Sequence, residues 1–251
     1  MRALDLRLDT ALTVAREAAA LAIAMRPSPG AAQATLKGRQ DWLTAADGAV
    51  EQLIAARLAA AHPEDGFQGE EGGTTRAGSL RWVVDPIDGT SNYARGATRW
   101  CVSIGLMDGG QSVLGVLAAP ALGETFAARD GAAATLNGTP IHVAATAALD
   151  RAIIEAGWSP RVAAADYLAL CDRLMGAGAM LRSGGSGALG LADVAAGRID
   201  AYAELHINLW DCAAALAILA GAGAVISAFD PAGGPLLAAA PGVAAAVRAV
   251  F

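Results

Sequence analysis

Cysteine is scarce in this 251-residue sequence, which contains only Cys101, Cys171 and Cys212. The three residues lie far apart and show none of the short spacings that bind a metal or build a disulfide framework. A free cysteine usually behaves as a small hydrophobic side chain. We therefore expect all three cysteines to be buried.

Aromatic and basic residues are also few. Aromatic side chains make up 5% of the sequence, and 18 Lys and Arg stand against 24 Asp and Glu, which gives a formal net charge of −6. Binding to nucleic acid needs clustered cations that neutralise phosphates. The composition therefore predicts that nucleic acid is not a main partner.

The two most apolar stretches are both interrupted. Residues 11–25 carry Arg16 and Glu17, and residues 212–224 contain Gly221 and Gly223. The first pattern is typical of an amphipathic helix rather than a signal peptide, and the second stretch is short for a bilayer span. We expect a soluble cytoplasmic protein with no membrane partner.

Hydrophobic residues nevertheless make up 55% of the sequence, and many of them are alanine. A chain of this length can bury a sizeable core, in one large domain or in two closely joined halves. The periodicity of apolar residues predicts helices over residues 4–25, 49–61, 166–175, 188–196 and 210–220. Strand-forming runs are predicted at residues 82–84, 101–107, 112–118, 125–128, 151–156 and 199–204. Residues 30–39 are predicted to be a polar connection.

The most informative stretch is residues 80–92, which read LRWVVDPIDGTSN. The strand is expected to end at Asp85-Pro86, because proline cannot donate to a sheet ladder. Asp85 and Asp88 then lie three residues apart on a predicted turn, and residues 90–92 are typical of a helix N-terminus. Two carboxylates on one turn repel each other unless a cation lies between them, and a helix start offers N–H groups to an anion. The stretch therefore predicts a divalent metal beside a phosphate.

Other interpretations of this motif exist. An Asp-x-x-Asp-Gly turn is also common as a solvated loop. Phosphatases of the haloacid dehalogenase type carry Asp-x-Asp-Gly-Thr after a strand, with the first Asp as a covalent nucleophile. Here Pro86 and Ile87 separate the two aspartates. The second carboxylate would then point to the wrong side of the turn, so this alternative is discounted.

Acidic residues elsewhere could join the site. Glu70 and Glu71 follow a short predicted strand in a glycine-rich loop. If that strand is a neighbour of the strand at residues 82–84, these acids come within reach of Asp85.

Three predicted helix starts carry polar residues whose roles the sequence leaves open. Asp47 is either the N-cap of the helix at 49–61 or part of the site, and Asp211 is either a cap or a metal ligand. Residues 183–187, Ser-Gly-Gly-Ser-Gly, precede a predicted helix and form a second possible anion site.

Taken together, these segments resemble the inositol monophosphatase family of magnesium-dependent, often lithium-sensitive phosphomonoesterases. The matching pieces are Gly-Glu-Glu at residues 69–71, Trp-Val-Val-Asp-Pro-Ile-Asp-Gly-Thr-Ser-Asn at 82–92 and Trp-Asp-Cys-Ala-Ala at 210–214. Asp-x-x-Thr-x-x-Asp at residues 41–47 and the serine-glycine segment at 183–187 also fit. The match covers most of the chain and keeps the family's order of motifs.

The resemblance implies an α/β fold in which layers alternate in the order α-β-α-β-α. It implies a single domain over residues 1–251, with most metal ligands in the N-terminal half, about residues 1–145. The C-terminal half, about residues 146–251, would add Asp211 and the residues on the substrate side. Assembly as a homodimer is also implied.

By this resemblance, the metal ligands are Glu70, Asp85, the carbonyl of Ile87, Asp88 and Asp211. Hard oxygen ligands suit Mg²⁺ and disfavour zinc or copper. The resemblance implies two or three Mg²⁺ ions per site. Two of them, bridged by Asp85, would lie about 3.5–4 Å apart, as in two-metal hydrolysis.

The implied catalytic residues are Glu70, Thr90 and Asp47. Glu70 would hold or deprotonate the attacking water, supported by the other two. No covalent intermediate with the enzyme is required. The residues implied to bind substrate are Asp88, Gly89, Thr90, Ser186, Gly187 and Glu204.

The implied reaction is the Mg²⁺-dependent hydrolysis of a small phosphate monoester, such as inositol monophosphate or a similar polyol or alcohol phosphate. Residues 205–209, Leu-His-Ile-Asn-Leu, replace the Gly-Ile-His-Cys type of segment found in inositol-specific members. The substrate therefore stays open among family alternatives: histidinol phosphate, fructose 1,6-bisphosphate or a 3′(2′),5′-bisphosphate nucleotide. An alternative of another class is a non-catalytic regulatory interaction protein.

Overall fold

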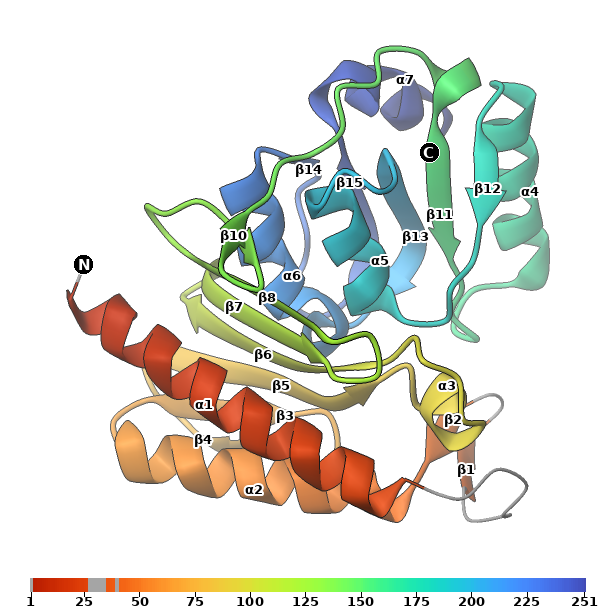
Figure 1. Ribbon diagram of the computed structural model, residues 1–251. Helices are drawn as coiled ribbons and strands as arrows, with labels where there is room; N and C mark the ends of the chain where they lie inside the picture. Colours follow the sequence, from red (N-terminus) through yellow and green to blue (C-terminus); the bar gives the residue numbers. More distant parts are fainter. Residues whose placement is uncertain (1, 27–34, 39–40) are drawn as a thin grey trace.

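The computed structural model describes residues 2–26, 35–38 and 41–251, which form alternating layers of helices and sheets (Figure 1). The described helices are α1 (Arg2–Met25), α2 (Ala45–Ala61), α3 (Thr90–Ala94), η1 (Leu149–Arg151, a 3₁₀ helix), α4 (Ala164–Gly176), α5 (Gly187–Ala195), α6 (Leu209–Ala222) and α7 (Pro241–Val250). In Figure 1, α1 and α2 lie below a large sheet, and α5 and α6 lie above it. A smaller sheet follows, with α4 and α7 on its outer side. The predicted α-β-α-β-α layering is confirmed.

The larger sheet holds the N-terminal motifs. Its strands are β3 (Gly66–Gly69), β4 (Gly73–Arg76), β5 (Leu80–Asp88), β6 (Cys101–Asp108), β7 (Gln111–Ala119), β8 (Glu124–Arg129), β9 (Thr135–Leu136) and β10 (Thr139–Pro140). Among the described residues, the spatial order is β10-β9-β8-β7-β6-β5-β3-β4. The predicted hairpin of β6 and β7 is confirmed. Strand β3 pairs parallel with β5, so the condition under which Glu70 and Glu71 come within reach of Asp85 is met.

The smaller sheet belongs to the C-terminal half. Its strands are β11 (Ile153–Gly157), β12 (Met180–Arg182), β13 (Ala201–Ile207), β14 (Val225–Ile226) and β15 (Gly234–Ala239). In the described part of the chain their order is β12-β11-β13-β15-β14, and β11 is parallel to both of its neighbours. Parallel neighbours require crossover connections, which here contain α4 and α5. The start of α5 is thereby brought to the edge of the site.

The polar connection predicted over residues 30–39 is only partly within the described residues. Its described part is strand β1 (Thr35–Gly38), which pairs antiparallel with β2 (Asp41–Leu43). The structure therefore places a strand where only a polar connection was predicted. A strand of four residues has too little hydrophobic alternation to be recognised in the sequence. Residues 27–34 and 39–40 lie outside the described residues.

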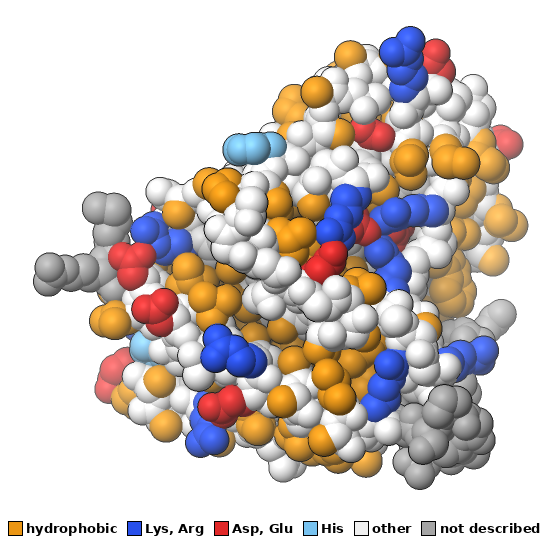
Figure 2. Space-filling view, viewed as in Figure 1, with side chains coloured by type: hydrophobic (Ala, Val, Ile, Leu, Met, Phe, Trp, Pro, Cys, Tyr) orange, Lys and Arg blue, Asp and Glu red, His pale blue; other side chains and the backbone are white. Residues whose placement is uncertain are grey.

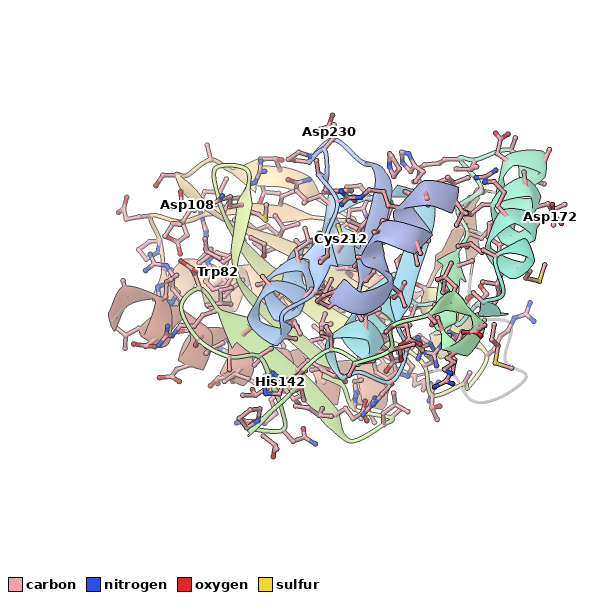
Figure 3. The ribbon with its side chains drawn as sticks, turned by 90° about the horizontal axis from the view of Figure 1, so that it is seen from above. Trp82, Asp108, His142, Asp172, Cys212 and Asp230 are labelled. Carbon is pink, nitrogen blue, oxygen red and sulfur yellow. The ribbon has the colours of Figure 1, made fainter. Side chains whose placement is uncertain are left out.

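Seen from above, Cys212 lies near the middle of the molecule on α6, whereas Asp108 and Asp230 lie at its rim (Figure 3). Cys101 and Cys212 are buried, as predicted, but Cys171 is only partly buried. Helix α4 buries Leu170 and so turns the next residue away from the smaller sheet. None of the described helices combines the length and the apolar character needed to cross a membrane.

Small residues allow α6 to approach the larger sheet closely. A Cβ atom at Gly115 on β7 would overlap the backbone of Ala214 on α6, and one at Gly105 on β6 would lie 2.8 Å from Ala213. Real Cβ atoms essentially never come this close to backbone atoms. The abundant alanine of the sequence is therefore used to bring α6, which carries Asp211, against the sheet that carries Asp85.

We expect Gly115→Ala to lower the free energy of unfolding by about 1–3 kcal/mol, because the added methyl group overpacks the contact between β7 and α6. The matched control is Gly110→Ala in the β6–β7 turn, where an added Cβ meets no atom within 4 Å. Urea unfolding of both variants measures the difference. Equal midpoints for Gly115→Ala and Gly110→Ala would contradict the packing argument.

Candidate active site

Strand β5 presents Asp85 and Asp88 to the site through a β-bulge. Asp85 pairs with Ser103 and Asp88 with Cys101, so three steps along β5 oppose two along β6. In a regular strand, residues three apart point to opposite faces. The extra residue of the bulge allows Asp85 and Asp88, although three residues apart, to point to the same side of the sheet. The prediction that the strand ends at Asp85-Pro86 is therefore wrong, and the bulge accommodates the proline, as bulges commonly do.

Asp211 reaches the same place from the first turn of α6. The N-cap of this helix is Asn208, and Asp211 is its third residue. The backbone and side-chain N–H groups of Asn208 both donate to Oδ2 of Asp211 at 3.1 Å. The sequence left open whether Asp211 caps the helix or serves the site. The structure shows that it belongs to a capping box and also lies beside the β5 aspartates.

Asp85, Asp88 and Asp211 form an acidic cluster in which one carboxylate oxygen from each residue lies within 4.8 Å of the others. Asp85 is 2% exposed and Asp88 is 6% exposed. Burial, followed by the negative charges of Glu70 and the other two aspartates, raises the pKa of Asp85 well above its ordinary value. Burial and Asp211 raise the pKa of Asp88 to about 7. Such crowding is unfavourable unless a proton or a cation neutralises it.

The donor set of this cluster fits a hard divalent cation. Its side-chain donors are carboxylate oxygens, which Mg²⁺ and Ca²⁺ prefer and which offer no soft ligand to zinc or copper. The N–H of Ile87 donates to Oδ1 of Asp85 at 2.9 Å and so fixes the orientation of this carboxylate. The cluster is therefore suited to hold a metal ion.

Glu70 follows the end of β3, beside this cluster. Its N–H donates to the carbonyl of Val84 at 3.1 Å, which extends the pairing of β3 and β5 by one residue. Val84 immediately precedes Asp85, and the charge of Glu70 contributes to the raised pKa of Asp85. Glu70 also lines the same cavity as Asp88 and Asp211. The expected approach of Glu70 to the β5 aspartates is thus observed.

Asp47 and Thr90 form a hydrogen-bonded pair across two helix starts. The hydroxyl of Thr90 donates toward Oδ1 of Asp47 at 3.3 Å and toward the carbonyl of Ile87 at 2.9 Å. Oδ2 of Asp47 accepts from the N–H and the hydroxyl of Thr44 at 2.8 and 2.6 Å. Burial raises the pKa of Asp47, although the hydrogen bonds from Thr44 oppose the shift.

The interpretation of Asp47 as the N-cap of α2 is wrong. The N-cap is Thr44, and Asp47 is the third helical residue of a capping box. In such a box the third residue reaches back to the backbone of the cap, and this orientation leaves one of its oxygens for Thr90. The helix accordingly begins earlier than its apolar periodicity indicated, because Ala45 and Ala46 already belong to it.

The start of α5 holds Asp88 instead of an external anion. The hydroxyl of Ser186 donates to Asp88, and so do the N–H groups of Gly187 and Ala188, at 3.2 and 3.1 Å. Ser186 also caps α5 by accepting from Leu189. The predicted second anion site at residues 183–187 is therefore corrected. Its anion is the carboxylate of Asp88, from the other half of the chain.

The acidic cluster opens into a polar cavity of about 360 Å³. Its lining includes Gly89, Thr90, Ser186, Gly187 and Glu204. The structure thus gathers the residues predicted to bind substrate around one space.

Glu204 lines this cavity and is 7% exposed. Burial raises its pKa to about 8, even though the hydroxyl of Tyr202 donates a hydrogen bond to it. The sequence analysis did not single out Tyr202. Tyr202 and Glu204 are two residues apart on β13 and so share one face of the strand, which was the available signal.

Sequence reasoning also missed the contacts that fix the loop before α5. The side-chain amide of Asn92 donates to the carbonyls of Arg99 and Gly184 at 2.8 and 2.9 Å. The guanidinium of Arg99 binds Glu155 and Asp193, each at 2.8 Å. Arg99 is seven residues from Asn92, but the other partners are between 56 and 94 residues away, so no local pattern indicates them.

Comparisons with known proteins agree with this architecture. A Nus factor SuhB of Xylella fastidiosa is 39% identical over 201 residues, covering 79% of this chain and 73% of the relative. An inositol-1-monophosphatase of Rhizobium meliloti is 37% identical over 209 residues, covering 81% of this chain and 78% of the relative. The solved structure of an inositol monophosphatase from Anabaena aligns with a TM-score of 0.87 at 30% identity, covering 98% of this chain and 95% of that one.

The fold and these similarities define a hydrolase of the phosphatase class. The model of the inositol monophosphatase family matches residues 4–250. The chain belongs to the inositol monophosphatase family, whose members are generally metal-dependent.

The crowding of the cluster predicts a pH dependence of stability without divalent metal. The pKa of Asp85 is raised in the folded state, so the folded protein keeps a proton that the unfolded chain loses above about pH 3.9. The contribution of Asp85 to stability therefore decreases as the pH rises. In EDTA, we expect Asp85→Asn to gain stability over the wild type with rising pH, by at most about 1.4 kcal/mol per pH unit.

Urea unfolding of both proteins between pH 5 and 8 measures this gain. Asn can keep the acceptor that Asp85 offers to the N–H of Ile87, so the substitution is nearly isosteric. Asp88 is less suitable, because both of its oxygens accept hydrogen bonds from the start of α5. A stability difference that stays constant over this pH range would show that the carboxylates are not crowded in solution.

Proposed function

We propose that this protein hydrolyses the phosphate monoester of a small polyol or alcohol, with inositol monophosphate as the first candidate, and depends on Mg²⁺. The observation that carries the proposal is the buried cluster of Asp85, Asp88 and Asp211 at the end of a polar cavity. A phosphate monoester is a dianion, so a site walled by carboxylates can accept it only together with cations. The relatives named inositol-1-monophosphatase support the substrate class.

The proposed ligands of two or three Mg²⁺ ions are the three aspartates, Glu70 and the carbonyl of Ile87. The chemistry that Mg²⁺ supplies at such a site is neutralisation of phosphate charge and a lowered pKa for water. The carboxylates contribute by position, since β5 and α6 hold them within 4.8 Å of one another before a metal binds. Such preorganisation means that little rearrangement is needed during the reaction.

Glu70, Thr90 and Asp47 are the proposed catalytic residues. The proton of Thr90 is directed toward Asp47 and the carbonyl of Ile87, so the lone pairs of its hydroxyl are available to a water molecule. Thr90 would thus orient the attacking water, and Glu70 would accept its proton. No side chain needs to form a covalent intermediate with phosphate.

The proposed substrate-binding residues all line the cavity. The N–H groups of Gly89 and Thr90 would bind phosphate oxygens, and Glu204 would bind hydroxyl groups of the alcohol. Ser186 and Gly187 would act mainly through Asp88, because their hydrogen bonds already go to its carboxylate. Histidinol phosphate, fructose 1,6-bisphosphate and a bisphosphate nucleotide remain alternative substrates for the same chemistry.

The test is phosphate release from a panel of these esters with Mg²⁺ and with EDTA. We expect turnover that requires Mg²⁺, with Asp85→Asn at least about 100-fold slower, because losing this ligand removes several kcal/mol of charge stabilisation in the transition state. The matched control is Asp65→Asn. Asp65 is equally buried, but it binds Arg7 and the indole of Trp82 away from the cavity. Phosphate release from Asp85→Asn at the wild-type rate would refute the proposal.

A second candidate function is a regulatory interaction, alone or beside catalysis, because several relatives are named Nus factor SuhB. We propose catalysis as the main function, with a homodimer as its cytoplasmic form and nucleic acid not a main partner. On the face drawn in Figure 2, basic side chains lie beside acidic ones. Among the described ion pairs, Arg198 binds Glu124 and Arg129 binds Asp5. No turnover on the whole panel, together with a stoichiometric partner in a pull-down, would favour the regulatory role.

A further inference from the structure

Helix α2, in the layer beneath the larger sheet, carries two buried carboxylates on one face. Asp47 and Glu51 are four residues apart, so they lie one above the other on the same face of the helix. Both are buried, with 1% and 6% exposure. Asp47 binds Thr44 and Thr90, as described above. Glu51 has no place in the proposed reaction, although burying a carboxylate is costly unless its partners compensate.

The partners of Glu51 are two consecutive backbone N–H groups in the loop after β3. Its Oε2 accepts from the N–H of Glu71 at 2.9 Å, and its Oε1 accepts from the N–H of Gly72 at 2.7 Å. The loop is shaped around this carboxylate. A Cβ at Gly69 would overlap the carboxylate, and one at Gly72 would lie 2.9 Å from Oε1.

These contacts hold Glu70 from both sides. On one side, the N–H of Glu70 itself donates to the carbonyl of Val84 on β5 at 3.1 Å. On the other side, the N–H groups of the next two residues, Glu71 and Gly72, donate to Glu51. The backbone of Glu70 is therefore clamped between the sheet and α2, at the level of Asp85. A side chain whose backbone is clamped in this way loses little further freedom when it acts.

We infer that Glu51 is a positioning residue for Glu70, and through it for the metal and the attacking water. This inference rests on the proposed function. Only a carboxylate can serve here, because two N–H donors must be accepted by two oxygens of one side chain. In Glu51→Gln, the amide group would present a donor to one of these N–H groups. In Glu51→Asp, both acceptors remain but are one methylene shorter.

The experiment is a double-mutant cycle of Glu51→Gln and Glu70→Gln, with Glu51→Asp as the conservative variant. We expect Glu51→Gln to lower kcat and Mg²⁺ affinity by about tenfold to hundredfold, the usual range for a residue that orients a metal ligand. KM for the ester should change less than about twofold, because Glu51 is not among the residues that line the cavity. Glu51→Asp should fall between Glu51→Gln and the wild type. In the Glu70→Gln background, Glu51→Gln should have almost no additional effect.

Calorimetric titration with Mg²⁺ alone supplies a readout that needs no substrate. The control variant is again Asp65→Asn, which we expect to lower the melting temperature but to leave Mg²⁺ affinity and kcat near the wild-type values. If wild-type protein turns over no ester, the proposed function fails, while the Mg²⁺ titration still tests the role of Glu51.

Three results would overturn the inference. The first is Mg²⁺ affinity and kcat of Glu51→Gln equal to those of the wild type. The second is additive losses in the double mutant, which would mean that Glu51 does not act through Glu70. The third is a loss in Glu51→Gln that is matched by Asp65→Asn at equal loss of stability. If Glu51→Gln does not fold, Glu51→Asp and its cycle with Glu70→Gln decide the question by the same criteria.

Discussion

Mutual repulsion among Asp85, Asp88 and Asp211 is the constraint on which the rest of this structure depends. Three carboxylates within 4.8 Å, largely removed from water, oppose folding when all are ionised. The protein tolerates them because hydrogen-bond donors hold each one in place: Asn208 for Asp211, the start of α5 for Asp88, and the N–H of Ile87 for Asp85. These donors fix position without neutralising charge. The repulsion therefore lowers the stability of the folded protein at a place where a cation can bind strongly.

Both halves of the chain are needed to build the site. Asp88 belongs to β5 in the larger sheet, yet its three hydrogen bonds from residues 186–188 come from the start of α5, about a hundred residues later. Asn92 and Arg99 fix the loop that precedes this helix. The geometry of Asp88, a proposed metal ligand in one half, therefore depends on the docking of the other half. Substitutions at that junction should affect metal binding even where they touch neither metal nor substrate.

The sequence predicted the layered fold, the hairpin of β6 and β7 and the acidic residues of the site, because each rests on local patterns or on motifs in a fixed order. It failed where two local rules conflicted. Pro86 is a normal signal for the end of a strand, but the bulge lets β5 continue to Asp88. Asp47 is a good N-cap by residue type, but Thr44 occupies that position. The serine-glycine segment at 183–187 has the pattern of an anion site, but the anion that it binds is the carboxylate of Asp88 from the same chain. Pairings over such sequence distances leave no local pattern.

The buried acids around this cavity are of two kinds, which differ in the hydrogen bonds that they accept. Glu51 accepts one backbone N–H on each oxygen, and Asp47 accepts from Thr44 and Thr90, so both are used to hold neighbouring segments. Asp85 receives a bond from Ile87 on one oxygen and faces the charges of four other acids, which raise its pKa together with burial. An acid that is crowded by negative charge gains most from a cation. We therefore expect Asp85 to gain most from a bound cation, while α2 holds the loop of Glu70 through Glu51 and contacts Thr90 through Asp47.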